Sequence, residues 1–352
     1  MKCVKFEFEK NYIKDFIGLP RRLYDADCNT ENPDEVRQLL TGKHPLSKYF
    51  TLDKFLIYRG KEAVARFVIT TYPNDTTAYL GFFECVEEDA TAKYAFEVIQ
   101  EFVKGRYDKI IGPVDASFWI KYRLKINCFD REPYTGEPYN REYYPRLFRN
   151  NGYQVCEHYI SNHYLPIEQE YVNEKCAGRY EAFLQKGYRI VSPDMQNFDS
   201  ILKELYGLLT KLYRNFPIYK DLSLEDFVGT FQSYKLILNP SMVKLAYYRD
   251  TLAGFFISVP NYSNKVYHLT PRNLIRIMKT KKSPKEYVML YLGVDEGHAG
   301  LGSALSHSII EALRENGATS IGALARDGKV TQNYVSDKIA ERYEYVLFER
   351  KL

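Results

Sequence analysis

The chain lacks the features that mark several large classes of protein. Its six cysteines are scattered, without a C-x-x-C pair or a Cys/His metal spacing, so neither a disulfide framework nor a metal site is predicted. No apolar run approaches the length of a membrane span. The first ten residues alternate as a strand does and lack the apolar region of a signal peptide. We therefore expect reduced thiols, no bound metal and a cytoplasmic location.

The charge and the composition of the chain are also ordinary. The net charge of +4 is small and spread along the chain, which does not favour nucleic-acid binding. A hydrophobic content of 45% and a charged content of 27% are ordinary for a globular protein. A length of 352 residues allows two domains that each bury a core. We expect neither nucleic acid nor membrane as a partner, and the sequence does not predict an oligomeric state.

Both common phosphate-binding loops are missing too. No Lys-Ser/Thr follows the glycines as in a P-loop, and the order G-x-G-x-x-G is absent. The chain has G-x-x-G-x-G instead, as Gly297-His-Ala-Gly-Leu-Gly302, between an apolar strand that begins at Tyr287 and a helix. Glycines let the backbone approach a ligand, and the first N–H groups of a helix point at an anion. The segment therefore predicts a phosphate site.

Three glycines between a strand and a helix can also be only a tight connection. The sequence behind the turn favours the functional interpretation. Apolar residues from Ala304 to Leu313 share one helical face, and Asn316-Gly317 supplies a helix stop. A further apolar run, 320–325, then reads as a strand.

Strand, glycine turn, helix and strand at this spacing resemble the acetyl-CoA-binding core of the GNAT acetyltransferase superfamily. That family's loop is usually Q/R-x-x-G-x-G/A, and Gly300 and Gly302 match its later positions, whereas Gly297 stands where Gln or Arg is usual. The resemblance implies acetyl-CoA as cosubstrate. The cofactor-binding residues that it implies are Leu292, Val294, Gly297, His298, Ala299, Gly300, Leu301, Gly302, Ser303 and Asn333.

A repeat with a shift of about 210 residues extends the resemblance over nearly the whole chain. The apolar face of the helix near Tyr94–Val103 matches that of the helix after the turn, and the strand Ala78–Phe83 matches the strand before it. A period this long indicates a duplicated domain. The predicted fold class is α/β (α+β), with two GNAT-like domains, each a mixed, mainly antiparallel sheet flanked by helices.

The first copy has no glycine at its turn. Glu84-Cys-Val-Glu-Glu-Asp-Ala-Thr-Ala92 carries four carboxylates there, which would repel a pyrophosphate. Acidic residues also simply favour helix N-termini through the helix dipole. We expect the first copy to have lost the cofactor.

The domain boundaries follow from this repeat. Residues 1–165 are predicted as a degenerate GNAT-like domain that shapes the acceptor pocket or is structural, 166–187 as a linker, and 188–352 as the GNAT domain with the pyrophosphate turn. The loop 132–145 is rich in tyrosine, which suits a substrate pocket or packing between domains. The basic insertion 267–285 is either a surface amphipathic helix or a lid that attracts an anion.

The resemblance implies direct attack of a primary amine on the thioester carbonyl. Asp295 and Glu296 are candidate bases, and Tyr334 beside Asn333 is the candidate acid that protonates the leaving thiolate. We expect an N-acetyltransferase whose acceptor is a small-molecule or peptide amine. Two alternatives remain open: an acyl-CoA-binding sensor without turnover, and an aminoacyl-tRNA-dependent transferase of the same fold.

Overall fold

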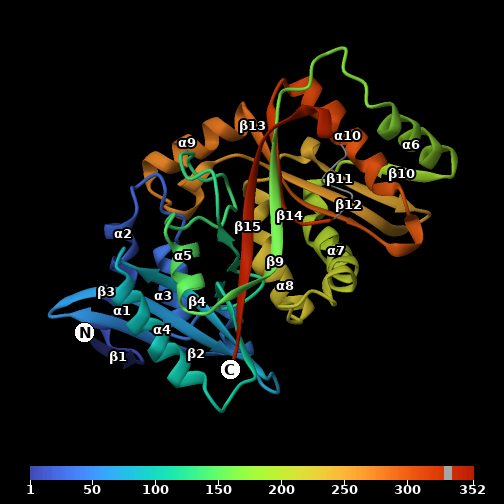
Figure 1. The fold of residues 1–352 in the computed structure, drawn as a ribbon. Coiled ribbons are helices and arrows are strands. Elements are labelled where there is room, and N and C mark those ends of the chain that lie inside the picture. Colours follow the sequence, from blue (N-terminus) through green and yellow to red (C-terminus); the bar gives the residue numbers. More distant parts are fainter. Residues whose placement is uncertain (329–334) are drawn as a thin grey trace. The chain divides into compact units, whose positions relative to one another are not determined.

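The computed structural model describes residues 1–328 and 335–352, which divide into two compact units. Unit 1 comprises Met1–Pro133, Glu137–His158 and Glu344–Leu352, and unit 2 comprises Tyr134–Gly136 and Tyr159–Tyr343. The chain leaves unit 1 along strand β9 (Gln154–Tyr164) and returns to it along strand β15 (Ile339–Lys351). Figure 1 labels most of the elements of both units.

The sheet of unit 1 is antiparallel except at one step. Its order is β1-β2-β3-β4-β5, and only β4 and β5 are parallel, because helix α4 crosses between them. The end of β15 pairs antiparallel with β5, from Phe348↔Gly112 to Lys351↔Lys109. The elements are β1 (Lys2–Phe6), β2 (Thr51–Arg59), β3 (Glu62–Thr71), β4 (Thr77–Cys85), β5 (Lys109–Gly112), β6 (Val114–Asp115), β7 (Lys121–Tyr122), β8 (Leu124–Lys125), α1 (Lys10–Gly18), α2 (Pro20–Leu23), α3 (Pro33–Leu40), α4 (Asp89–Val103) and α5 (Tyr144–Asn150).

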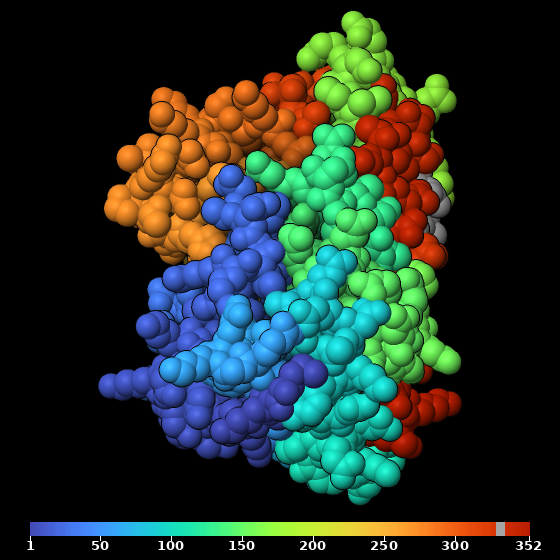
Figure 2. All heavy atoms as spheres, turned by 60° about the vertical axis from the view of Figure 1, so that its left-hand side comes forward, coloured from blue at the N-terminus to red at the C-terminus, as the bar shows by residue number. Residues whose placement is uncertain are grey.

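Unit 2 repeats this order of elements. Strands β10 to β13 form an antiparallel meander, helix α10 follows β13, and β14 pairs parallel to β13. Strand β9 then pairs antiparallel with β14. Helix α9 stands between β12 and β13 and lies at the surface, orange in Figure 2. The elements are β10 (Tyr188–Val191), β11 (Val243–Tyr248), β12 (Thr251–Pro260), β13 (Glu286–Val294), β14 (Thr319–Arg326), α6 (Glu174–Gln185), α7 (Phe198–Tyr213), α8 (Leu224–Phe231), α9 (Pro271–Lys282) and α10 (Leu301–Asn316).

Local sequence signals account for the helix ends. The side chain of Asn32 accepts hydrogen bonds from two backbone N–H groups at the start of α3, and the hydroxyl of Ser223 accepts one from the Asp226 N–H at the start of α8. Thr270 caps α9, with Pro271 at its first position. Gly317 is left-handed, with φ +63°, and ends α10 as the Asn-Gly pair predicts.

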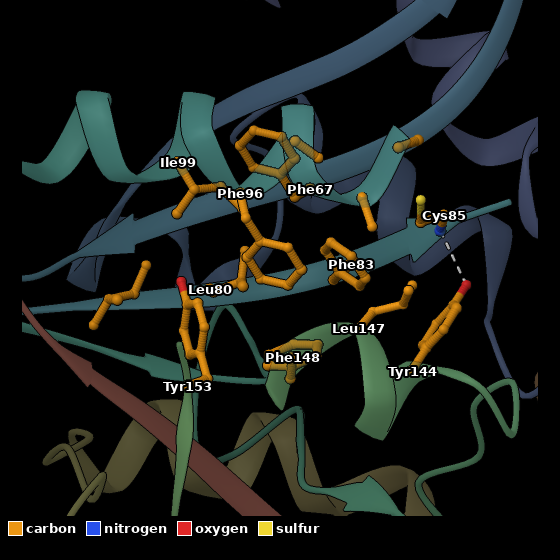
Figure 3. Close-up of a cluster of buried hydrophobic side chains, with 14 of the residues drawn as sticks. Phe67, Leu80, Phe83, Cys85, Phe96, Ile99, Tyr144, Leu147, Phe148 and Tyr153 are labelled. Carbon is orange, nitrogen blue, oxygen red and sulfur yellow. Dashed lines mark hydrogen bonds between the residues drawn. The ribbon is translucent and has the colours of Figure 1, made fainter. Parts of the chain in front are cut away.

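Aromatic side chains from α4, α5 and the sheet fill the core of unit 1 (Figure 3). The ring of Phe148 lies 5.3 Å from that of Phe83 and 5.2 Å from that of Phe96. The N–H of Cys85 donates to the hydroxyl of Tyr144 at 3.0 Å, which attaches α5 to the end of β4. Many of the chain's tyrosines therefore serve packing, where they bury a large area and still satisfy a polar tip.

The core of unit 2 lies between its sheet and helices α6 and α10. Leu301, Ala304, Leu305 and Ile309 of α10 are almost wholly buried there, together with Cys176 and Phe183 of α6. The apolar face predicted for the helix after the glycine turn is confirmed.

The predicted domain boundaries differ from the two units. The segment 166–187, expected to be a linker, contains α6, whose apolar face packs on α10 inside unit 2. The chain's last residues, Glu344–Leu352, belong to unit 1, although 188–352 was expected to form one domain. Both differences arise from strand and helix pairings between distant parts of the chain, which the repeat alone does not reveal.

Neither a membrane span nor a metal cluster is found in residues 1–328 and 335–352. Every helix there is too short or too polar to cross a bilayer. No group of three or more His, Cys, Asp or Glu side chains is arranged there to hold a metal ion.

Candidate functional site

The candidate site is the turn between β13 and α10 in unit 2. Residues Glu296–His298 form one short 3-10 turn (η6), and Gly300 is the N-cap residue of α10. Gly300 has φ +93°, a backbone conformation that side chains rarely adopt, so the turn requires a glycine there. No side chain caps α10 within the described residues. The N–H of Ser303 donates to the carbonyl oxygen of Gly300 at 3.2 Å, and the N–H groups of Leu301 and Gly302 are left for an anion.

The predicted turn residues differ in how they are placed. Leu301 and Ser303 are buried at the start of α10, whereas Ala299 and Gly297 are exposed. A Cβ on Gly297 would meet nothing within 4 Å. The space at Gly297 would therefore accept the Gln or Arg that is usual in the resembling family, and nothing in the packing explains the glycine.

His298 is held from the neighbouring strands. Its Nδ1 lies 2.6 Å from the hydroxyl of Tyr188 on β10. The ring of Tyr188 stacks on that of Tyr248 at 4.6 Å, which fixes the hydroxyl in place. This contact attaches the turn to the sheet, so His298 is a structural part of the turn as well as a candidate phosphate contact.

A cation from outside the motif lies against the turn. A Cβ on Gly300 would be 3.5 Å from Cζ and Nη1 of Arg179. Arg179 is an exposed residue of α6, and its guanidinium forms no hydrogen bond or ion pair with other described residues. Arg179 is not among the residues predicted from the sequence, because 166–187 was expected to be a linker. The spacing of Cys176, Tyr180 and Phe183 could have indicated an amphipathic helix.

Strand β13 offers backbone groups next to the turn. It pairs with β14 only over Glu286–Met289, whereas its pairing with β12 continues to Val294. The register with β12 shifts at the same point, between Ile257 and Ser258. Leu292 and Val294 therefore lie on the part of β13 whose second edge is not paired by β14, where backbone N–H groups can meet a ligand.

Gly293, in the same stretch, is required by packing. A Cβ there would lie 2.5 Å from the ring of Phe255 and 2.7 Å from a methyl group of Leu212. Phe255 is fully buried and has little room to give way. This glycine lets α7 and β12 approach the strand that carries the site.

The two candidate bases have different surroundings. Asp295 forms an ion pair with Lys211 of α7 and accepts the Glu296 N–H at 2.8 Å. The hydrogen bond from Lys211 lowers the pKa of Asp295, which makes it a weak base. The exposed carboxylate of Glu296 forms no hydrogen bond or ion pair with the described residues.

Asn333 and Tyr334 lie outside the residues that the structure describes, so the acid assignment stays a prediction.

The matching turn of unit 1 has a different chemistry. Helix α4 starts after Glu88, whose backbone is extended with φ −143°. Glu88 pairs with Arg59, and Arg146 of α5 pairs with Asp89 and Glu87. The carboxylates at this helix start are thus neutralised by arginines of the same unit.

The tyrosine-rich loop 132–145 is held by hydrogen bonds. Within unit 2 the hydroxyl of Tyr134 lies 2.7 Å from Oγ of Ser161, and the N–H of Thr135 donates to Oδ1 of Asn261 at 3.0 Å. Within unit 1 Glu137 forms a fully buried ion pair with Lys125, at 2.7 Å. These contacts show a packing role for the loop; a substrate-pocket role stays untested.

The fold of both units and the glycine turn of unit 2 define the class: the chain has the GNAT fold. It is similar to a tandem GNAT protein from the clavulanic acid biosynthesis pathway, with 10% identity and a TM-score of 0.51. The match covers 99% of this chain and 98% of that protein. It is also similar, over 99% of its length, to a GCN5-related glucosamine N-acetyltransferase region of a fungal multi-domain β-N-acetylglucosaminidase, with 12% identity, a TM-score of 0.53 and 38% of that chain covered. A third similar structure is a GCN5-related N-acetyltransferase from Anabaena variabilis, with 10% identity and a TM-score of 0.50. The match covers 98% of this chain and 72% of that protein.

No family model matches the sequence, and no curated protein matches it. At these identities the likeness to the solved structures concerns the fold. The predicted fold class is thereby confirmed.

Proposed function

We propose that unit 2 binds acetyl-CoA at the turn before α10 and transfers the acetyl group to a primary amine. The observation that carries this proposal is Gly300. Its left-handed backbone opens the N-terminus of α10. Among the described residues, no side chain caps this end of the helix, so an anion can bind there. The GNAT fold supports acyl transfer as the general chemistry.

The residues around the turn suit a pyrophosphate. The N–H groups at the start of α10 supply donors, and the positive end of the helix dipole favours the anion. Arg179 adds a full positive charge beside Gly300, and a guanidinium is well matched to phosphate oxygens. We infer that Arg179 takes over the contact that Gln or Arg at position 297 makes in the resembling family.

The bound cosubstrate would supply an acyl group activated as a thioester. In the transfer, the amine nitrogen forms the new C–N bond as the C–S bond breaks; the ammonium proton goes to a base, and the sulfur receives a proton. The chain's own part is to orient the thioester oxygen against the open edge of β13 near Leu292–Val294 and to take up the proton. Glu296 is the better base of the two candidates, because Asp295 is committed to Lys211.

The second candidate function is an acyl-CoA sensor without turnover. The ion pair of Asp295 favours it, because that contact removes one of the two predicted bases. The aminoacyl-tRNA-dependent alternative would not need the open turn at Gly300.

Calorimetry with acetyl-CoA tests the binding step. We expect binding by the wild-type protein and by Gly297→Ala, where a Cβ meets nothing within 4 Å, and none by Gly300→Glu. Circular dichroism checks that each variant is folded. If the wild-type protein does not bind, the cofactor assignment is wrong.

Thiol release from acetyl-CoA, measured with amino acids, polyamines, amino sugars and peptides, then separates enzyme from sensor. Release with one class of amine identifies the acceptor class. Binding of acetyl-CoA without release on any amine would favour the sensor.

A further inference from the structure

Helix α9 presents large apolar side chains to solvent. None of its residues is buried, and Leu274, Ile275 and Met278 are 46%, 56% and 71% exposed. Leu269, just before the helix, is 63% exposed. The helix is nevertheless well formed, because Thr270 caps it and Pro271 occupies its first position. Folded proteins rarely leave a contiguous aliphatic surface of this kind without a partner for it.

The same helix is strongly basic. From His268 to Lys285 the chain has no Asp or Glu, and it carries the six cations Arg272, Arg276, Lys279, Lys281, Lys282 and Lys285. None of these six forms an ion pair within the described part of the chain. The one hydrogen bond of the group runs from Lys281 to the backbone oxygen of Leu236, at 2.6 Å. Leu236 is itself 74% exposed.

Apolar and basic residues form two adjoining stripes on the exposed surface of α9. Asn273, Ile277 and Thr280, which lie on one face, are partly buried. At 100° per residue, the exposed side chains of Leu274, Ile275 and Met278 lie opposite this face, and the exposed Arg272, Arg276 and Lys279 form an adjoining stripe along the helix. Figure 2 shows the orange atoms of this part of the chain at the surface.

We propose that α9 docks unit 2 on an anionic lipid surface. A bilayer interface satisfies both halves of this face together: the aliphatic side chains enter the boundary of the acyl chains, and the flexible cations reach the headgroup phosphates. A nucleic-acid backbone would pair with the cations but would leave Leu274, Ile275 and Met278 in water. The site lies on a different element from the turn at Gly300, so the proposal does not depend on acetyl-CoA binding.

Vesicle sedimentation tests the proposal. The full chain is mixed with vesicles of phosphatidylcholine alone, or of phosphatidylcholine with one quarter phosphatidylglycerol. We expect binding to the anionic vesicles only, weakened at high salt. The apolar variant Leu274→Ser with Ile275→Ser and Met278→Ser should bind at least about tenfold more weakly, and so should the charge variant Arg272→Gln with Arg276→Gln and Lys279→Gln.

Matched variants on other elements serve as controls. Val172→Ser with Leu184→Ser removes apolar side chains that are 64% and 41% exposed, and Lys14→Gln with Lys104→Gln and Lys203→Gln removes three exposed charges. Both should bind as the wild-type protein does. In a Trp119→Phe background, Ile275→Trp should show a blue shift of emission with anionic vesicles, and Leu184→Trp should show none.

Three results would overturn the proposal: no binding to anionic vesicles, binding that survives the apolar variant, or an unshifted Trp emission at position 275. If the apolar variant binds vesicles normally while the charge variant loses binding to single-stranded RNA, the helix is a nucleic-acid contact instead. Circular dichroism and thermal unfolding of all these variants check that the fold is intact.

Discussion

The hydroxyl of Tyr188 lies 2.6 Å from Nδ1 of His298, and this hydrogen bond connects strand β10 to the turn before α10. The two residues are 110 positions apart in the chain. The turn before α10 is therefore positioned by the sheet beneath it and not by its glycines alone.

Removal of this contact should weaken cofactor binding moderately. Tyr188→Phe keeps the ring that stacks on Tyr248 and removes the hydroxyl, so the turn loses one hydrogen bond. A net value of about 0.5–1.5 kcal/mol corresponds to a loss of affinity for acetyl-CoA of about 2- to 10-fold by calorimetry. Tyr248→Phe is the control, and equal losses in both variants would contradict a specific role of the Tyr188 hydroxyl.

Arg179→Gln should weaken acetyl-CoA binding by about tenfold, since a charge-assisted contact to phosphate would be lost. The salt dependence of binding should fall as well. Lys175→Gln, an exposed cation earlier on the same helix, should bind normally. If affinity rises in Arg179→Gln, the guanidinium obstructs the turn and the inferred contact is wrong.

Asp295→Asn should leave the pH profile of transfer unchanged between about pH 6 and 9, because Lys211 keeps this carboxylate ionised throughout. The pair is accessible to solvent, so its contribution to the stability of unit 2 should be small. Because the folded-state pKa is lowered, that stability is present above the ordinary carboxyl pKa and is lost as the pH falls through the lowered value. A shift of the acidic limb in Asp295→Asn, with Glu296→Gln unaffected, would identify Asp295 as the base after all.

Glu84 should make unit 1 more stable at pH 5 than at pH 8. Burial raises its pKa to about 7, although Arg66, 3.8 Å away, acts in the opposite direction. Its Oε2 accepts hydrogen bonds from Tyr24 and Tyr144, at 2.9 and 2.5 Å. Between the ordinary carboxyl pKa and about 7, the folded state binds more protons than the unfolded state, so the free energy of unfolding falls as the pH rises.

Chemical denaturation at several pH values checks this sign. Relative to wild type, Glu84→Gln should gain up to about 3 kcal/mol between pH 5 and pH 8, because it cannot ionise. Glu97→Gln, on the exposed face of α4, is the control and should show no such gain. A stability difference that does not change with pH would show that Glu84 titrates normally.

Gly293→Ala should destabilise unit 2 by about 1–3 kcal/mol, because the new Cβ would overlap the buried ring of Phe255. Gly297→Ala has open space and should be close to neutral. Thermal unfolding of the two variants compares them directly. A neutral Gly293→Ala would mean that Phe255 and Leu212 can move aside.

Much of the secondary structure could be predicted from the sequence because its signals are local. Asn32 with Pro33, and Asn316 with Gly317, mark helix ends by themselves. The basic insertion 267–285 does contain a helix, α9. That the apolar residues of α9 are exposed could not be predicted, because periodicity shows which residues share a face but not whether that face is covered. The expectation of no membrane partner rested on the lack of a spanning segment, and α9 would lie on a membrane surface without crossing it.

By itself the sequence determined the GNAT-like order of strands and helices and the glycine turn at Gly297–Gly302, since both depend on spacing over a few residues. Only the tertiary structure decided what surrounds the turn. Arg179 and Tyr188 reach it from α6 and β10, and Asp295 is held by Lys211 of α7. The last strand shows the same limit, because Glu344–Leu352 completes unit 1 by pairing with β5, more than 200 residues earlier. Contacts between such distant segments depend on how the whole chain packs, and no local pattern records them.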